Sequence, residues 1–256
     1  MCLQGARGST GPFELSIGFL AAGAVLASFL WKENKAEKTT SSDGKQSEPT
    51  IRDAVKVVKD DPNIMLVGAV QSLFEAAMYI FVLQWPPAIT GVIAKSFGGA
   101  ATPYGTVFSC FMASCLLGST IFGQLVKRNV STETSTSAML SVATVAMGIA
   151  AFVSKSSSAA SAPFAVLVAA FFAFEGCVGM YFPSIGTLRS KYVPDSHRSV
   201  IMNLFGIPLN VLVVSVFLSI KKLGVSGALG VSASALALAT GSMFKLRSRS
   251  NGKAVQ

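Results

Sequence analysis

Long apolar segments separated by short polar segments are the dominant pattern of the chain. Seven of these segments approach or exceed the roughly 20 residues that a helix needs to cross a bilayer. Helix is favoured over strand, because hydrocarbon offers no partner to an unpaired backbone group. The fourth segment is the weakest, since its first turn is polar. The pattern predicts an all-α, polytopic transmembrane helix bundle with about seven spans at 12–31, 63–84, 104–126, 134–153, 163–182, 199–220 and 223–244.

One sizeable polar segment, residues 32–62, separates the first two spans. Its first half has the Lys, Glu, Ser and Gly content of a disordered linker. Its second half places Ile51, Val55 and Val58 on one side of a helix, which favours a short amphipathic helix on the membrane surface. Acidic residues and Pro62 then signal the start of the next helix.

The first apolar segment has two interpretations. Arg7 precedes it near the beginning of the chain, which is compatible with a secretory signal. However, the segment exceeds the usual signal length and ends in bulky residues, Phe29 to Trp31, rather than at a small-residue cleavage site. A retained membrane helix is therefore the preferred interpretation.

Composition supports a lipid environment and argues against several functions. Of the residues, 51% are hydrophobic and only 13% are charged, against about 25% charged in soluble domains. The net charge of +9 comes from Lys and Arg between the apolar segments, so no basic face for nucleic acid is expected. The four cysteines lack C-x-x-C spacing and His197 is the single histidine. We therefore expect no metal, no cofactor and, without a catalytic motif, no enzyme.

The basic residues also predict the orientation. If the linker is cytoplasmic, 16 of the 21 Lys and Arg residues lie on the cytoplasmic side. The predicted parts are then an N-terminal helix (1–31), a cytoplasmic linker (32–62), six helices (63–244) and a basic cytoplasmic tail (245–256). This plan resembles part of a major facilitator carrier, in which a long cytoplasmic loop joins two six-helix halves. The chain would supply helix six, the loop and the C-terminal half.

Two acidic residues, Glu75 and Glu175, lie inside predicted spans, where a carboxylate is costly unless it is paired, hydrated or protonated. Gln71, Glu75 and Tyr79 share one helix face at i, i+4 and i+8, which is typical of a polar stripe along a cavity. Glu75 is a candidate to line a solute pathway or bind a coupling proton. For both acids the alternative is a structural hydrogen bond between helices, and Gly176 beside Glu175 favours such packing.

Further polar candidates lie in the last three spans. Asn203 and Asn210 are two turns apart on one face, with Pro208 between them to free a backbone carbonyl. Arg189 and Lys191 stand at the cytoplasmic end of a span, where a gate ion pair could form with a loop acid such as Asp195. Packing around a kink, and simple anchoring at the interface, are the respective alternatives.

Several stretches resemble the molybdate-anion transporter family, a branch of the major facilitator superfamily. They cover most of the chain from the first span onward. The matching stretches are Phe29-Leu-Trp-Lys-Glu-Asn34, Gln71-Ser-Leu-Phe-Glu75 with Phe81-Val82 and Trp85-Pro-Pro87, Phe108-Ser-Cys-Phe-Met-Ala113 with Leu117-Gly-Ser119, Gly179-Met-Tyr-Phe-Pro-Ser184 with Leu188-Arg-Ser-Lys191 and Pro194, and Met202-Asn-Leu-Phe205 with Pro208-Leu-Asn210.

The resemblance implies a carrier for the oxyanion molybdate at the plasma membrane, with twelve helices when whole. Its partners would be a small anion, the lipid bilayer and a proton as coupling ion. The family commonly has an arginine where this chain has Gly206. A guanidinium there would suit a tetrahedral dianion. The alternatives are a truncated, non-transporting membrane scaffold or regulator, and a major facilitator carrier for another small solute.

Overall fold

The computed structural model describes residues 10–31, 50–98, 101–155 and 162–253, and these are helical apart from short connections. Seven helices in this part of the chain are long and apolar enough to cross a membrane, which confirms the predicted all-α bundle. The elements are α2 (Gly11–Leu30), α3 (Ile51–Asp60), α4 (Pro62–Ser96), α5 (Tyr104–Lys127), α6 (Thr132–Lys155), α7 (Ala162–Tyr192), the 3₁₀ turn η2 (Asp195–His197), α8 (Arg198–Leu218) and α9 (Ile220–Lys253).

The chain divides into two units, Met1–Ser47 and Glu48–Gln256. The first unit contains α2, whose bounds agree with the predicted span at 12–31. Apolar residues surround the whole circumference of α2, and its one acidic residue, Glu14, stands in the first turn. A helix that is apolar on every side is typical of a membrane span.

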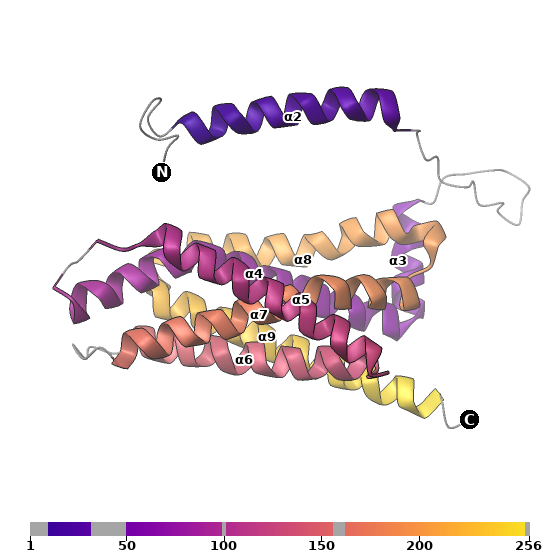
Figure 1. Cartoon of the computed structure of the whole chain (residues 1–256). Coiled ribbons are helices and arrows are strands. Elements are labelled where there is room, and N and C mark those ends of the chain that lie inside the picture. Colours follow the sequence, from indigo (N-terminus) through magenta and orange to yellow (C-terminus); the bar gives the residue numbers. More distant parts are fainter. Residues whose placement is uncertain (1–9, 32–49, 99–100, 156–161, 254–256) are drawn as a thin grey trace, which may run out of the picture. The chain divides into compact units, whose positions relative to one another are not determined.

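The long helices of the second unit run side by side, with α8 and α6 on opposite sides of the bundle (Figure 1). Helix α4 contacts α7, α8 and α9, and α7 contacts α4, α5 and α6, so α4 and α7 hold the centre. Arg249 near the end of α9 donates to Asn63 Oδ1 at the start of α4, at 3.1 Å. The six-helix unit therefore begins and ends at the same end, as six crossings require.

Three helices are clearly longer than the apolar pattern predicts. Helix α7 continues from Phe182 through Pro183 to Tyr192. Helix α4 continues from Gln84 through Pro86 and Pro87 to Ser96. Prolines are tolerated inside membrane helices. Just beyond them, Thr90 Oγ1 donates to the Pro86 carbonyl of the same helix at 2.9 Å. Helix α9 extends beyond the predicted end at 244 and carries much of the basic tail as helix.

Helix α3 forms where an amphipathic helix is predicted, but its buried side differs. Ala54 is fully buried, and Val57 and Val58 pack beside it in a cluster with Ile201 and Phe205 of α8. Ile51, which the sequence pattern assigned to the apolar side, is 65% exposed. The side of α3 that is buried is therefore the one that packs on α8.

Aromatic side chains fill the centre of the bundle between α4, α5 and α7. Phe74 stacks on Tyr181 with ring centroids 4.0 Å apart, and Phe81 meets Phe171 edge to face at 5.0 Å. Helices in lipid gain little from the hydrophobic effect, so close packing of this kind is what holds them together.

Helices α5 and α7 approach backbone to backbone at glycines. A Cβ atom on Gly118 would lie 1.8 Å from the Gly176 carbonyl oxygen, and one on Gly179 would lie 1.8 Å from the Cys115 carbonyl oxygen. Only residues without a side chain fit this crossing, which is the small-residue contact typical of membrane helices. The crossing fixes α7 relative to α5.

Candidate functional site

A polar cluster joins α4 to α7 in the otherwise apolar centre of the bundle. Arg189 Nε donates to Gln71 Oε1 at 2.9 Å, and Arg189 Nη2 donates to Glu75 Oε1 at 3.1 Å. The side chains of Arg189 and Glu75 are 27% and 20% exposed, so the ion pair is only partly open to the surroundings. The predicted polar stripe on α4 and the predicted cytoplasmic residue on α7 therefore meet directly.

Tyr181 completes this cluster. Its hydroxyl donates to Glu75 Oε1 at 2.9 Å, while its ring is fully buried against Phe74. Sequence analysis did not single out Tyr181, although a tyrosine inside an apolar span normally needs a partner for its hydroxyl. Gln71, Glu75, Tyr181 and Arg189 form what we call the α4–α7 polar cluster.

The predicted pairing of Arg189 with Asp195 is wrong. Asp195 lies beyond the end of α7, in η2, where it pairs with Arg198 three residues later at 2.5 Å. Arg189 is still within α7, and its side chain crosses to α4 because that neighbour carries the acceptors Gln71 and Glu75.

Tyr79 does not join the α4–α7 polar cluster. It is 48% exposed, and within the described part of the chain no hydrogen bond is recorded for its hydroxyl. Tyr79 follows Gln71 by two steps of four residues. Because each step exceeds the 3.6-residue turn of an α-helix, the direction of the side chain shifts around the helix axis. Of the predicted polar stripe, only Gln71 and Glu75 therefore belong to the α4–α7 polar cluster.

Glu175 lies apart from the cluster and is 7% exposed. It precedes Gly176 at the α5–α7 crossing, and Cys115 of α5 lies within range of its charge. Among the described residues, no hydrogen bond or ion pair reaches its carboxyl group. Glu175 is thus a buried acid without a protein partner in the middle of a span.

The two asparagines of α8 are both exposed. Asn210 donates to the Gly206 carbonyl of its own helix at 2.8 Å. The neighbouring Phe205 carbonyl accepts from Ser72 Oγ of α4 at 2.6 Å, one turn before Pro208. Sequence analysis missed Ser72, because a serine in an apolar segment gives no distinct signal.

Lys191 belongs to a second cluster at the end of α7. Lys191 Nζ and the Tyr192 hydroxyl both donate to Glu133 Oε1, at 2.5 Å and 2.7 Å. Glu133 is only 4% exposed at the first turn of α6. It stands one residue before the predicted span at 134–153, so it was not among the acids predicted to lie inside a span.

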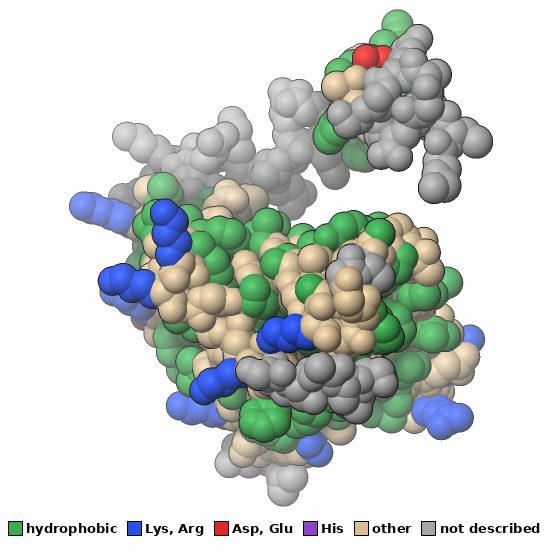
Figure 2. Space-filling model, turned by 90° about the vertical axis from the view of Figure 1, so that its left-hand side faces the viewer, with side chains coloured by type: hydrophobic (Ala, Val, Ile, Leu, Met, Phe, Trp, Pro, Cys, Tyr) green, Lys and Arg blue, Asp and Glu red, His purple; other side chains and the backbone are tan. Residues whose placement is uncertain are grey.

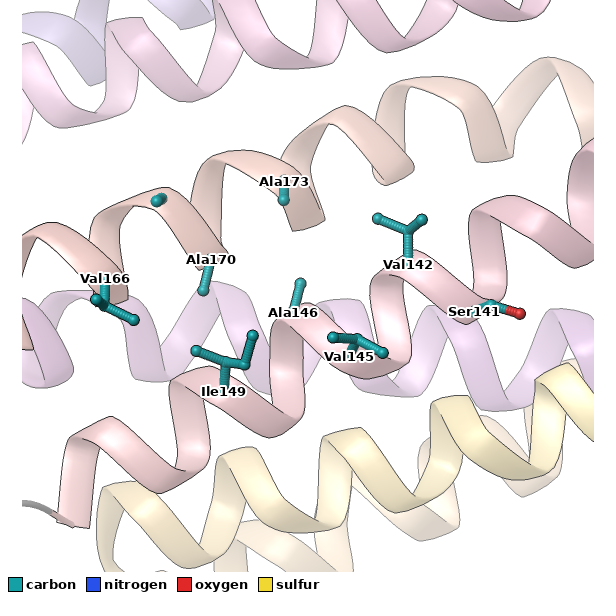
Figure 3. A pocket seen from close by; sticks show the side chains of 9 residues that line it. Ser141, Val142, Val145, Ala146, Ile149, Val166, Ala170 and Ala173 are labelled. Carbon is teal, nitrogen blue, oxygen red and sulfur yellow. The ribbon is translucent and has the colours of Figure 1, made fainter.

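The larger hollows of the described residues are apolar and do not coincide with these clusters. One, of about 540 Å³, lies between α6 and α7 and is lined by residues such as Val142, Ile149 and Ala170, with Ser141 as its polar member (Figure 3). At one end of the chain's second unit, hydrophobic side chains cover much of the surface and Lys and Arg appear as separate points (Figure 2). The exposed apolar side chains beside the hollow between α6 and α7, such as Val145 and Ile149, suit contact with lipid.

The sequence of the chain matches a known family of membrane proteins. A major facilitator family model, described as sugar transporters with 12 transmembrane helices, matches residues 5–177, which is more than half of the chain. The chain belongs to this family. Its membership agrees with the seven apolar helices and makes it a multi-pass membrane protein of a family described as transporters.

Curated relatives are named as molybdate-anion transporters. The chain is 29% identical to that of Takifugu rubripes, 27% to that of Xenopus tropicalis and 26% to that of Danio rerio, over 80% of this chain in each case. The matches cover 45%, 42% and 44% of those proteins, so the chain spans less than half of their length. No solved structure matches the chain.

Proposed function

We propose that the chain forms the C-terminal part of a secondary carrier that takes up molybdate, or a similar small oxyanion, by alternating access. The α4–α7 polar cluster is the observation that carries the proposal. A charged pair between the two central helices of a membrane bundle is costly, and such pairs mark solute pathways in carriers. The names of the relatives supply the substrate class.

The remaining candidates fit a pathway in the following way. Gln71, Glu75 and Tyr79 of α4, Glu175 of α7, and Asn203 and Asn210 of α8 would line the solute pathway. Glu75 or Glu175 would bind the coupling proton, and Glu175 is the acid whose charge is unmatched. Arg189 and Lys191 would steady the cytoplasmic gate through their bonds to α4 and α6. The plasma membrane is the proposed location.

An uptake assay tests this proposal. Cells that produce the intact gene product containing this chain are starved of molybdate and then given radioactive molybdate or radioactive glucose. Glucose is the matched comparison, because the family model is described as sugar transporters. We expect molybdate accumulation above that of cells with an empty vector, and no gain in glucose.

Absence of molybdate accumulation, with the protein present in the membrane, would contradict the proposed substrate. Accumulation of glucose instead would favour a sugar carrier. Neither result would change the family assignment, which rests on the match over residues 5–177.

A further inference from the structure

The α4–α7 polar cluster contains more hydrogen-bond donors than acceptors. A guanidinium has five N–H groups. Arg189 uses two of them, one for Gln71 and one for Glu75, which leaves three. The Gln71 amide oxygen accepts from Arg189, so its NH₂ group is turned away with two further donors. Apart from the Tyr181 hydroxyl, which is within hydrogen-bonding reach of Arg189, no described residue accepts from these remaining N–H groups.

The unused donors are accessible. The Arg189 side chain is 27% exposed, and the Gln71 amide nitrogen, which has no partner among the described residues, is not fully buried. Gly186, one turn before Arg189 on α7, is exposed, and a Cβ atom there would meet nothing within 4 Å. The surface of α7 is therefore open one turn before Arg189.

Glu75 is the only anion of the cluster, and one of its carboxylate oxygens accepts both hydrogen bonds. Oε1 accepts from both Arg189 Nη2 and the Tyr181 hydroxyl, and no donor is recorded for Oε2. Glu75 and Arg189 together carry no net charge. An incoming dianion would be repelled by Glu75 and attracted by Arg189, and the same donors that hold the carboxylate suit an oxyanion.

We infer that Arg189 is the residue that binds the transported oxyanion, and that Glu75 is an internal counter-ion which the anion displaces. Tyr181 and Gln71 supply additional donors to a tetrahedral dianion once Glu75 has moved. This assignment rests on the proposed function for its ligand class. It also places a guanidinium for the anion on α7, although position 206 of α8 is glycine.

Equilibrium binding of radioactive molybdate to the protein in lipid nanodiscs tests the inference. Arg189→Gln should weaken molybdate binding roughly 10- to 100-fold, as expected for the loss of charge-assisted hydrogen bonds. Glu75→Gln should tighten binding roughly 10-fold, because it removes a like charge a few ångströms from the anion. These opposite signs separate a displaceable counter-ion from a purely structural ion pair.

Two variants match the charge changes outside the cluster. Arg128→Gln removes an exposed arginine after α5, and Asp195→Asn removes an exposed acid in η2. Both should bind molybdate like the unchanged protein. Gel filtration and thermal unfolding of every variant show that the bundle is intact before binding is compared.

Wild-type affinity in Arg189→Gln would overturn the inference, and so would weaker binding in Glu75→Gln. Those results would leave the uptake proposal untouched if the intact protein still accumulates molybdate. Conversely, uptake of glucose but not molybdate would refute the proposed substrate and, with it, the ligand class assigned to Arg189.

Discussion

Adding a single methyl group at Gly118 should separate α5 from α7. The new Cβ would lie 1.8 Å from the Gly176 carbonyl oxygen, whereas real contacts of this kind stay above 3.0 Å. The two backbones must therefore move apart by about 1.2 Å, and neither can swing away like a flexible side chain. Overpacking of this kind costs about 1–3 kcal/mol. Alanine also favours a helix over glycine by about 0.5–1 kcal/mol, which leaves a net loss of about 0–2.5 kcal/mol.

Gly123→Ala on the same helix is the matched control, because a Cβ atom there meets nothing within 4 Å. It should be neutral or stabilising by about 0.5 kcal/mol, from helix preference alone. The free energy of unfolding is measured for both variants in mixed micelles by titration with a denaturing detergent. Equal stability of the Gly118→Ala and Gly123→Ala proteins would refute the backbone contact.

Three further substitutions have expected outcomes. Glu133→Gln should lower the free energy of unfolding by about 1–3 kcal/mol, since it weakens the buried acceptor of Lys191, and the detergent titration would show no change if that link were unimportant. Ser72→Ala should cost about 1 kcal/mol in the same titration through the lost bond to the Phe205 carbonyl, and full stability would argue against that bond. Gly206→Arg should fold normally, because a Cβ there meets only an amide nitrogen at 3.9 Å, and failure to form a monodisperse protein would show that the position is closed.

Much of the fold follows from the apolar pattern. Segments of about 20 uncharged residues have one stable structure in hydrocarbon, so all seven membrane helices could be predicted. The ends of these helices could not be predicted in the same way. Pro86 and Pro87 suggest a stop, yet α4 continues to Ser96, as membrane helices tolerate proline. Likewise, the side of α3 that is buried depends on its contact with α8, which its own periodicity does not contain.

Individual members of the candidate site could be predicted, but not their partners. Glu75 and Gln71 stand out because polar side chains are rare in spans, and Arg189 because it follows one. Pairing Arg189 with Asp195 was wrong, since nearness in sequence does not tell which helix lies across from α7. Tyr181 was missed for the same reason, and Glu133 because it stands one residue outside a predicted span. Each gains its role only from residues more than fifty positions away.

The most direct test of the account is a structure of the protein in nanodiscs with bound molybdate. We predict density for a tetrahedral anion within hydrogen-bond distance of the Arg189 guanidinium, with the Glu75 carboxylate moved away from it. An anion bound elsewhere, with the Glu75–Arg189 pair still intact at about the present 3.1 Å, would contradict it.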